Sequence, residues 1–288
     1  MNEGHIPYGK LFSATMIGYM GNVVLPARAG EFIRAYVLSR VRNNLAASKA
    51  FATIVAERIL DGFVLVALLC FVLLVLPTDE PVKIPEGTFF NQSVTVSADY
   101  LFGMAGAALA VLAAALAFAA LVYVKGGAVA TIFGKVFSVF SDGAAQRVTR
   151  AITSFATGFD IVRDKRRLAF AGLLSLFVWL PAALAIYPIL HAFPGDVQWP
   201  WYTPLVVLAV VCVGLMIPAS PGFVGTFHAF CVAALLLCAP VDFDSAVAFS
   251  VVYHAASMIA LVAVGVICLW VENLSFAEVA RRAETDSG

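Results

Sequence analysis

Charged and amide side chains gather in one short stretch near the start of the chain. Asn22, Arg28, Glu31 and Arg34 follow an apolar run that Pro26 interrupts. If a helix starts after this break, Glu31 and Arg34 lie one turn apart and can pair, which leaves the donors of Arg28 for an anion. This predicts a phosphate-sized site. The alternative is that the arginines only anchor the chain at a cytoplasmic interface, but Glu31 favours the site because acids contribute little to such anchoring.

A second group of charges follows about one helix length later. Glu57 and Asp61 are four residues apart and share one face of a helix, with Arg58 beside them. Charge inside a membrane is costly and is usually paired, so the two groups are natural partners. Two interpretations stay open, a polar cavity lining and a purely structural salt-bridge network.

A third segment combines prolines, glycines and a histidine between two apolar runs. Two prolines remove backbone donors and two glycines permit unusual dihedrals, so a continuous helix is not expected there. His228, and His254 further on, could shuttle protons, whereas histidines at such positions more often hydrogen-bond a neighbouring helix. The candidate residues of the segment are Pro218, Ser220, Pro221, Gly222, Gly225 and His228.

The elements that position these residues must lie in a membrane. Hydrophobic residues make up 62% of the chain and charged residues 12%, with a mean hydropathy of +0.94, far from the composition of soluble domains. The 18 basic and 18 acidic residues cancel, and no basic tract alternates with aromatics, so a nucleic-acid partner is excluded. No metal-ligand spacing and no nucleophile constellation is seen, so we expect no metal, no cofactor and no enzyme activity.

Apolar runs define an all-α, polytopic bundle of transmembrane helices. A membrane-spanning helix needs about 20 apolar residues. Three runs meet that length, and a fourth is slightly shorter but bounded by Pro77; they are Leu101–Val124, Leu168–Leu190, Ser245–Val271 and Leu60–Leu76.

Two further elements are too short or interrupted. Pro204–Ile217 and Thr226–Ala239 have 14 residues each and flank the proline-glycine segment. Leu11–Leu25 is also short, and the stretch Gly30–Arg40 follows it after Pro26. We therefore predict two broken or re-entrant elements in the bundle.

The distribution of basic residues predicts the orientation. The loop 125–167 holds eight Lys and Arg residues, whereas the loop 78–100 holds one beside four acids. The positive-inside rule places the first loop in the cytoplasm and the second outside. We expect an interfacial amphipathic helix at Gln146–Asp164 and a cytoplasmic tail at 272–288, within a single membrane domain spanning 1–288.

Three ordered motifs carry a resemblance to a known family. The stretches "GNVVLPARAGEFIRAYVLSR", "AERILDG" and "IPASPGFVGTFHAF" resemble the lysylphosphatidylglycerol synthase transmembrane-region family of flippase-like membrane proteins. The family's "LPxRxGE" motif falls on Leu25, Pro26, Arg28, Gly30 and Glu31, and its "ERxxD" motif on Glu57, Arg58 and Asp61. The proline-glycine motif falls on Pro218, Ser220, Pro221, Gly222 and Gly225.

The sequence departs from the family pattern at two places. His228 stands where the family commonly has an acid, so any role of that carboxylate is in doubt here. Family members usually carry one or two more helices before the first motif, which predicts either a truncated chain or a misassigned start. We expect this protein to lack the soluble catalytic domain that is fused to some members.

The resemblance implies a lipid flippase or transporter in the cell membrane, with a cytoplasmic C-terminus. Its substrate would be an anionic or lipid-linked molecule, a phospholipid or a polyprenyl phosphate. The expected partners are membrane lipids, while a homo-oligomer and a separate lipid-modifying enzyme stay open. A membrane-embedded transferase using Glu57 or Asp61 as a base, and a non-catalytic scaffold, are the alternatives.

Overall fold

The structure is a computed structural model, and its helices confirm the predicted all-α membrane fold. It describes residues 6–25, 29–41, 46–76, 82–84, 94–96, 98–138, 165–192, 197–216 and 220–276, together with single positions between 141 and 153. Pro26, Arg28 and Pro218, which the sequence singled out, lie outside the described residues.

The described helices are long where the sequence is continuously apolar and short where proline or glycine interrupts it. They are α1 (Tyr8–Val24), α2 (Gly30–Val41), α3 (Ala47–Val75), α4 (Ala98–Ser138), α6 (Lys165–Leu184), α7 (Ile186–Ala192), α8 (Thr203–Gly214), α9 (Thr226–Cys238) and α10 (Phe243–Val271), with a short 3-10 turn η2 (Pro221–Phe223).

Among the residues that the structure describes, five helical segments are long and apolar enough to cross a membrane. They are Ala47–Val75, Phe102–Val122, Ala169–Ala192, Pro221–Cys238 and Phe243–Val271. Three of them match predicted spans to within about two residues at each end, and Ala47–Val75 overlaps the predicted Leu60–Leu76 but begins well before it. The fifth joins η2 to α9 and is longer than the apolar run expected there, because the proline-glycine turn adds to the helical length.

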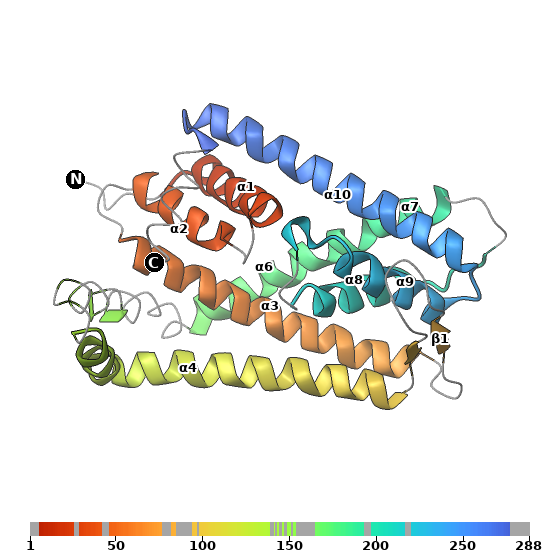
Figure 1. Ribbon diagram of the computed structural model, residues 1–288, viewed down its shortest axis with the longest axis horizontal. Helices are drawn as coiled ribbons and strands as arrows, with labels where there is room; N and C mark the ends of the chain where they lie inside the picture. The colour runs from red at the N-terminus through yellow and green to blue at the C-terminus, as the bar shows by residue number, and fades with distance from the viewer. Residues whose placement is uncertain are drawn as a thin grey trace. The chain divides into compact units, whose positions relative to one another are not determined.

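Both predicted interruptions are present. α1 ends at Val24 and α2 begins at Gly30, while α8 ends at Gly214 and α9 begins at Thr226. Within each pair the two short helices pack against each other, as Figure 1 shows for α1 with α2 and for α8 with α9. The re-entrant course of these pairs in a bilayer stays a prediction.

The chain divides into two compact units, each with its own core. The first comprises Met1–Leu60, Ala113–Gly172 and Leu261–Gly288, and the second comprises Asp61–Leu112 and Leu173–Ala260. Fully buried Ile17, Ile33 and Ile54 join α1, α2 and α3 in the core of the first unit. The core of the second unit centres on α8 and α9, where Val206 and Leu235 are fully buried.

Two connections differ from the simple all-helical expectation. The loop predicted to be external contains a small antiparallel pair, β1 (Val82–Ile84) and β2 (Val94–Val96). α4 has a non-helical backbone at Lys125, where a cytoplasmic loop was expected to start, and then continues as a helix to Ser138. Most of the predicted amphipathic helix Gln146–Asp164 lies outside the described residues.

Candidate functional site

Glycines bring α2 into direct contact with α1 in the first unit. A Cβ atom at Gly30 would overlap the carbonyl oxygen of Gly18 and would lie 2.6 Å from the amide nitrogen of Asn22. A Cβ at Gly18 would in turn lie 2.8 Å from Cβ of Arg34. Side chains at these positions would hold the helices apart, so small residues permit the close crossing, as in other packed membrane helices. The glycine of the first motif therefore positions the charges that follow it.

Arg34 and Glu57 form a two-pronged ion pair between α2 and α3. Nη1 of Arg34 donates to Oε1 of Glu57 at 2.8 Å, and Nη2 donates to Oε2 at 2.9 Å. Parallel hydrogen bonds of this kind are among the strongest polar contacts in proteins and fix the geometry of both partners. The sequence suggested that Arg34 would pair with Glu31 one turn away, but both terminal nitrogens of its guanidinium are taken up by Glu57.

Arg58 connects the remaining members of the group. Its Nη2 donates to Oε1 of Glu57 at 2.6 Å and to the hydroxyl of Tyr19 at 3.3 Å. Its Nε lies 4.0 Å from Oε1 of Glu31. Two sequence motifs separated by about one helix length thus meet, as predicted. We call Tyr19, Glu31, Arg34, Glu57 and Arg58 the arginine–glutamate cluster.

The cluster combines buried and accessible charge. The side chains of Arg34 and Glu31 are 13% and 16% exposed, whereas those of Arg58 and Glu57 are 36% and 38% exposed. Two arginines and two glutamates cancel in formal charge. In the described part of the chain, Oδ1 of Asn22 and Nε of Arg34 are buried without a hydrogen-bond partner, so the region retains polar capacity that protein contacts do not use.

Asp61, the last residue of the second motif, belongs to the second unit and contacts α6. Oδ1 of Asp61 accepts hydrogen bonds from Oγ of Ser175 at 2.5 Å and from Nε1 of Trp179 at 3.3 Å. Ser175 is buried. The predicted role of Asp61 alongside Glu57 and Arg58 stays a prediction.

The proline-glycine segment of the second unit is a tight turn held by two histidines. Gly222, Phe223 and Gly225 have φ values of 69°, 58° and 89°, a region that favours glycine. Nε2 of His254 donates to the carbonyl oxygen of Gly222 at 2.8 Å, and Nδ1 of His228 accepts from the backbone nitrogen of Gly225 at 3.2 Å.

These contacts give the side chains of His228 and His254 a structural role. The rings of His228 and His254 lie 4.7 Å apart in an edge-to-face arrangement, and both are buried. The hydroxyl of Ser220 adds a third bond, to the carbonyl of Val224 at 2.9 Å. The histidines therefore fix the turn, which is the more usual of the two roles considered from sequence.

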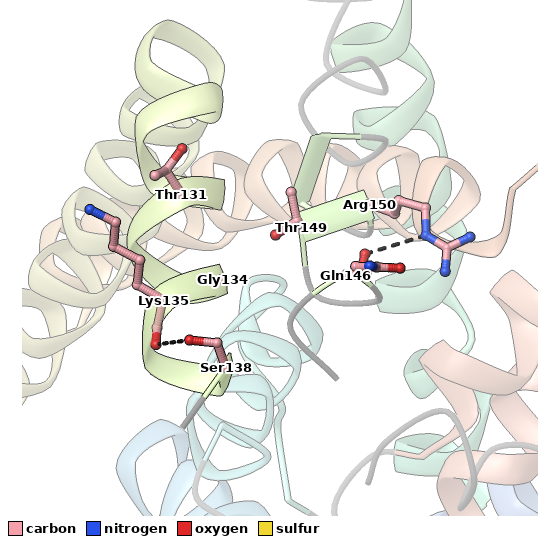
Figure 2. Close-up of a pocket in the computed structure, with 7 residues that line it drawn as sticks. All are labelled: Thr131, Gly134, Lys135, Ser138, Gln146, Thr149 and Arg150. Atoms are coloured by element: carbon pink, nitrogen blue, oxygen red, sulfur yellow. Dashed lines mark hydrogen bonds between the residues drawn. The ribbon is translucent and has the colours of Figure 1, made fainter. Parts of the chain in front are cut away.

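A surface pocket lies elsewhere in the first unit, near the end of α4. It has a volume of about 480 Å³ and is lined by Thr131, Gly134, Lys135, Ser138, Gln146, Thr149 and Arg150. Figure 2 shows the ammonium group of Lys135 and the guanidinium of Arg150 pointing away from each other. The two cations do not converge on a common ligand, so the pocket is a weaker candidate than the cluster.

Among the described residues, no group of three or more His, Cys, Asp and Glu side chains is arranged as metal ligands would be. The polar chemistry of the site is that of hydrogen bonds and charge. A guanidinium pair with a phenol can bind an oxyanion such as a phosphate without any metal.

The sequence profile of the lysylphosphatidylglycerol synthase transmembrane region matches residues 2–265. The chain belongs to this family. The match includes all three motifs and confirms the resemblance inferred from them. As a member of the lysylphosphatidylglycerol synthase transmembrane-region family with five candidate spans in its described part, the chain is a multi-pass membrane protein.

Three curated relatives are similar to this family member. Glycosyltransferase AglD of Haloferax volcanii is 30% identical over 264 residues, which cover 86% of this chain and 41% of the relative. The UPF0104 membrane protein PH1989 of Pyrococcus horikoshii is 26% identical over 240 residues, 77% of this chain and 64% of the relative. A UPF0104 membrane protein of Methanothermobacter thermautotrophicus is 26% identical over 234 residues, which cover 76% of this chain and 63% of the relative.

The chain spans between 41% and 64% of the length of these relatives. No solved structure matches the chain.

Sequence reasoning missed Tyr19, Ser175 and Trp179. Each carries one polar group inside an apolar run, and that is the signal that could have drawn attention to them. Their partners could not have been assigned, because Arg58 is 39 residues from Tyr19 and Asp61 is 114 residues from Ser175.

Proposed function

We propose that this protein moves a lipid with an anionic headgroup between the two leaflets of the cell membrane. The arginine–glutamate cluster carries the proposal. It lies where the short helices α1 and α2 meet α3, and α3 is a candidate span. The substrate would be a phospholipid or a polyprenyl phosphate, and the C-terminus would face the cytoplasm.

A headgroup crosses the hydrocarbon slowly because its charge loses hydration there. A protein lowers that barrier when it offers polar contacts at membrane depth, and the lipid tails can stay in the surrounding bilayer. Charge inside a span is itself costly, about 2.5–3.5 kcal/mol for an unpaired residue at the centre. Two arginines and two glutamates near a span are therefore consistent with a polar path for a headgroup.

A membrane-embedded transferase is the second candidate, because one relative is named glycosyltransferase AglD. The geometry of Glu57 argues against its use as a general base. Its two carboxylate oxygens already accept from two arginines, so neither oxygen is left without a donor. Asp61, which accepts hydrogen bonds from Ser175 and Trp179 through Oδ1, is the other carboxylate that a transferase could use.

A scaffold role is the third interpretation, in which the ion pairs only join helices. This alternative predicts stability effects on substitution of the cluster and no lipid movement by the wild-type protein. The three candidates thus differ in what happens to the lipid: it changes leaflet, it changes chemically, or it does neither.

Reconstitution in liposomes tests the proposal. Fluorescent phosphatidylglycerol placed in both leaflets is quenched from outside by dithionite, and a flippase makes the inner pool accessible. We expect the wild-type protein to do this and the Glu57→Gln variant to be slowed about tenfold or more, because both arginines lose a charged partner.

Glu272→Gln is the matched control. Glu272 also forms an ion pair in the first unit, with Lys10 at 2.5 Å, and in the described part of the chain its side chain has no hydrogen bond or ion pair with the cluster. It should leave the rate of lipid movement within about twofold of wild type. Lipid that stays in its leaflet with every candidate headgroup would exclude a flippase, and a new covalent lipid product would favour the transferase.

A further inference from the structure

Glu57 holds the two arginines of the cluster in unequal ways. Arg34 occupies both carboxylate oxygens with two nitrogens, whereas Arg58 reaches only Oε1. Arg34 is also the more buried of the two, at 13% against 36% exposure of the side chain. The shared carboxylate therefore separates a fixed cation from an accessible one.

The consequences of moving each arginine differ. If Arg58 turns toward another anion, Glu57 keeps its two-pronged pair with Arg34 and stays neutralised. If Arg34 leaves instead, a largely buried guanidinium loses its carboxylate, which is strongly unfavourable. Exchange of partners is therefore less costly for Arg58 than for Arg34, although it would also move Arg58 away from Glu31, which lies 4.0 Å from its Nε.

Tyr19 adds a neutral donor beside the accessible arginine. Its hydroxyl oxygen accepts from Nη2 of Arg58 at 3.3 Å, and its own proton is then available to an acceptor. Among the residues that the structure describes, no acceptor for that proton is seen. A guanidinium edge next to a phenol O–H offers convergent donors that suit a tetrahedral oxyanion.

We infer that Arg58 and Tyr19 receive the phosphate of the lipid headgroup, while Arg34 and Glu57 form the fixed support that positions them. This deepens the proposed function and rests on it for the identity of the ligand as a lipid. The shared chemistry is a phosphate with at least one free anionic oxygen. Tyr19 is a phosphate-binding residue that the sequence motifs do not contain.

The test measures lipid retention separately from lipid movement. The full chain is purified in detergent, incubated with phosphatidylglycerol, with diacylglycerol of the same acyl chains, or with inorganic phosphate, and analysed by native mass spectrometry. The variants are Arg58→Gln, Tyr19→Phe, Arg34→Gln and the control Lys135→Gln. Thermal unfolding is recorded for each variant.

We expect wild-type protein to retain phosphatidylglycerol but not diacylglycerol. Arg58→Gln should reduce that retention about tenfold and Tyr19→Phe several-fold, with little change in unfolding temperature, since one charge-assisted contact is lost at an accessible side chain. Tyr19→Phe should add little in the Arg58→Gln background. Arg34→Gln should lower the unfolding temperature most, and Lys135→Gln should match wild type.

Other outcomes would contradict the inference. Equal retention by wild type and Arg58→Gln, no retention by wild type, or equal destabilisation by Arg34→Gln and Arg58→Gln would each overturn the inference. Retention of inorganic phosphate as tightly as the lipid would overturn the assignment of a lipid ligand. If wild type retains the lipid through Arg58 but does not move it between leaflets, the proposed transport fails while this binding site stands.

Discussion

At the scale of residues, one carboxylate organises the charges of the candidate site. Glu57 accepts hydrogen bonds from Arg34 and Arg58, and Arg58 also lies within ion-pair distance of Glu31. Removing one member of a buried ion pair is costly because the other charge stays behind, whereas removing both is much less so. The stability of the cluster should therefore depend on which charges remain.

A double-mutant cycle between Arg34 and Glu57 measures this dependence. Glu57→Gln should lower the free energy of unfolding by about 3 kcal/mol, since it leaves the largely buried guanidinium of Arg34 without its carboxylate. Arg34→Gln should lower it by less, because Glu57 is 38% exposed and keeps its contact with Arg58. The double variant should be less destabilised than the sum of the two, with a coupling of about 1–3 kcal/mol. Thermal unfolding in detergent gives all four values.

The same cycle between Arg58 and Glu57 supplies the comparison. Its coupling should be smaller, because Arg58 contacts one carboxylate oxygen and is more exposed. Additive effects in the Arg34 cycle, or a larger coupling for Arg58, would show that the crossing of α2 and α3 does not depend on this pair.

At the scale of elements, the cluster depends on the distance between α1 and α2. Glycine at positions 18, 21 and 30 allows their backbones to approach, and a Cβ at Gly21 would lie 2.8 Å from Cδ1 of Ile33. Tyr19 on α1 and Arg34 on α2 are positioned by this contact. A wider crossing would separate the phenol from the arginines.

Gly30→Ala should therefore destabilise the protein. The added methyl group would overlap the backbone of α1, and overpacking of this kind costs about 1–3 kcal/mol. Gly9→Ala is the control, because nothing lies within 4 Å of a Cβ there and alanine favours a helix by up to about 1 kcal/mol over glycine. Thermal unfolding compares them, and equal unfolding temperatures would contradict the role of Gly30.

The sequence predicted the helices and their interruptions better than it predicted which side chains contact one another. Apolar length predicted the long helices, and Pro26 and the proline-glycine segment predicted the two breaks, because these signals are local in the chain. The pairing of Arg34 with Glu57 over 23 residues depends on how helices pack, which spacing alone does not determine. The structural use of Gly30 was missed for the same reason, since its close neighbour is Gly18 on another helix.

His228 illustrates a different limit of sequence reasoning. The residue type allowed either a proton relay or a structural hydrogen bond, and spacing could not choose between them. Its contact with the backbone of Gly225, and that of His254 with Gly222, became visible only with the turn itself. The positive φ of Phe223 carried no sequence signal at all.

At the scale of the whole molecule, the distribution of basic residues predicts which loops face the cytoplasm. The segment around Thr95 lies in a loop with one lysine and four acids, and Ser138 lies in a loop with eight basic residues. These two positions lie on either side of the candidate span Phe102–Val122 in α4. They should lie on opposite sides of the membrane.

Cysteine labelling in a cysteine-free background checks the orientation. Thr95→Cys should react with a membrane-impermeant maleimide added to intact cells, and Ser138→Cys should react only after the membrane is opened. Reaction of both positions in intact cells, or the reverse pattern, would contradict the predicted orientation. Each variant carries a single thiol, so protein without any cysteine reports the background.

The ion pair between Arg34 and Glu57 also constrains how the protein is made. Arg34 leaves the ribosome 23 residues before Glu57, so when the α1–α2 hairpin is synthesised Glu31 is the single acid in residues 8–41, beside Lys10, Arg28, Arg34 and Arg40. A lone guanidinium in lipid is expensive. During biogenesis, the hairpin must therefore stay hydrated, or be shielded by the insertion machinery, until α3 enters the membrane and brings Glu57 to it.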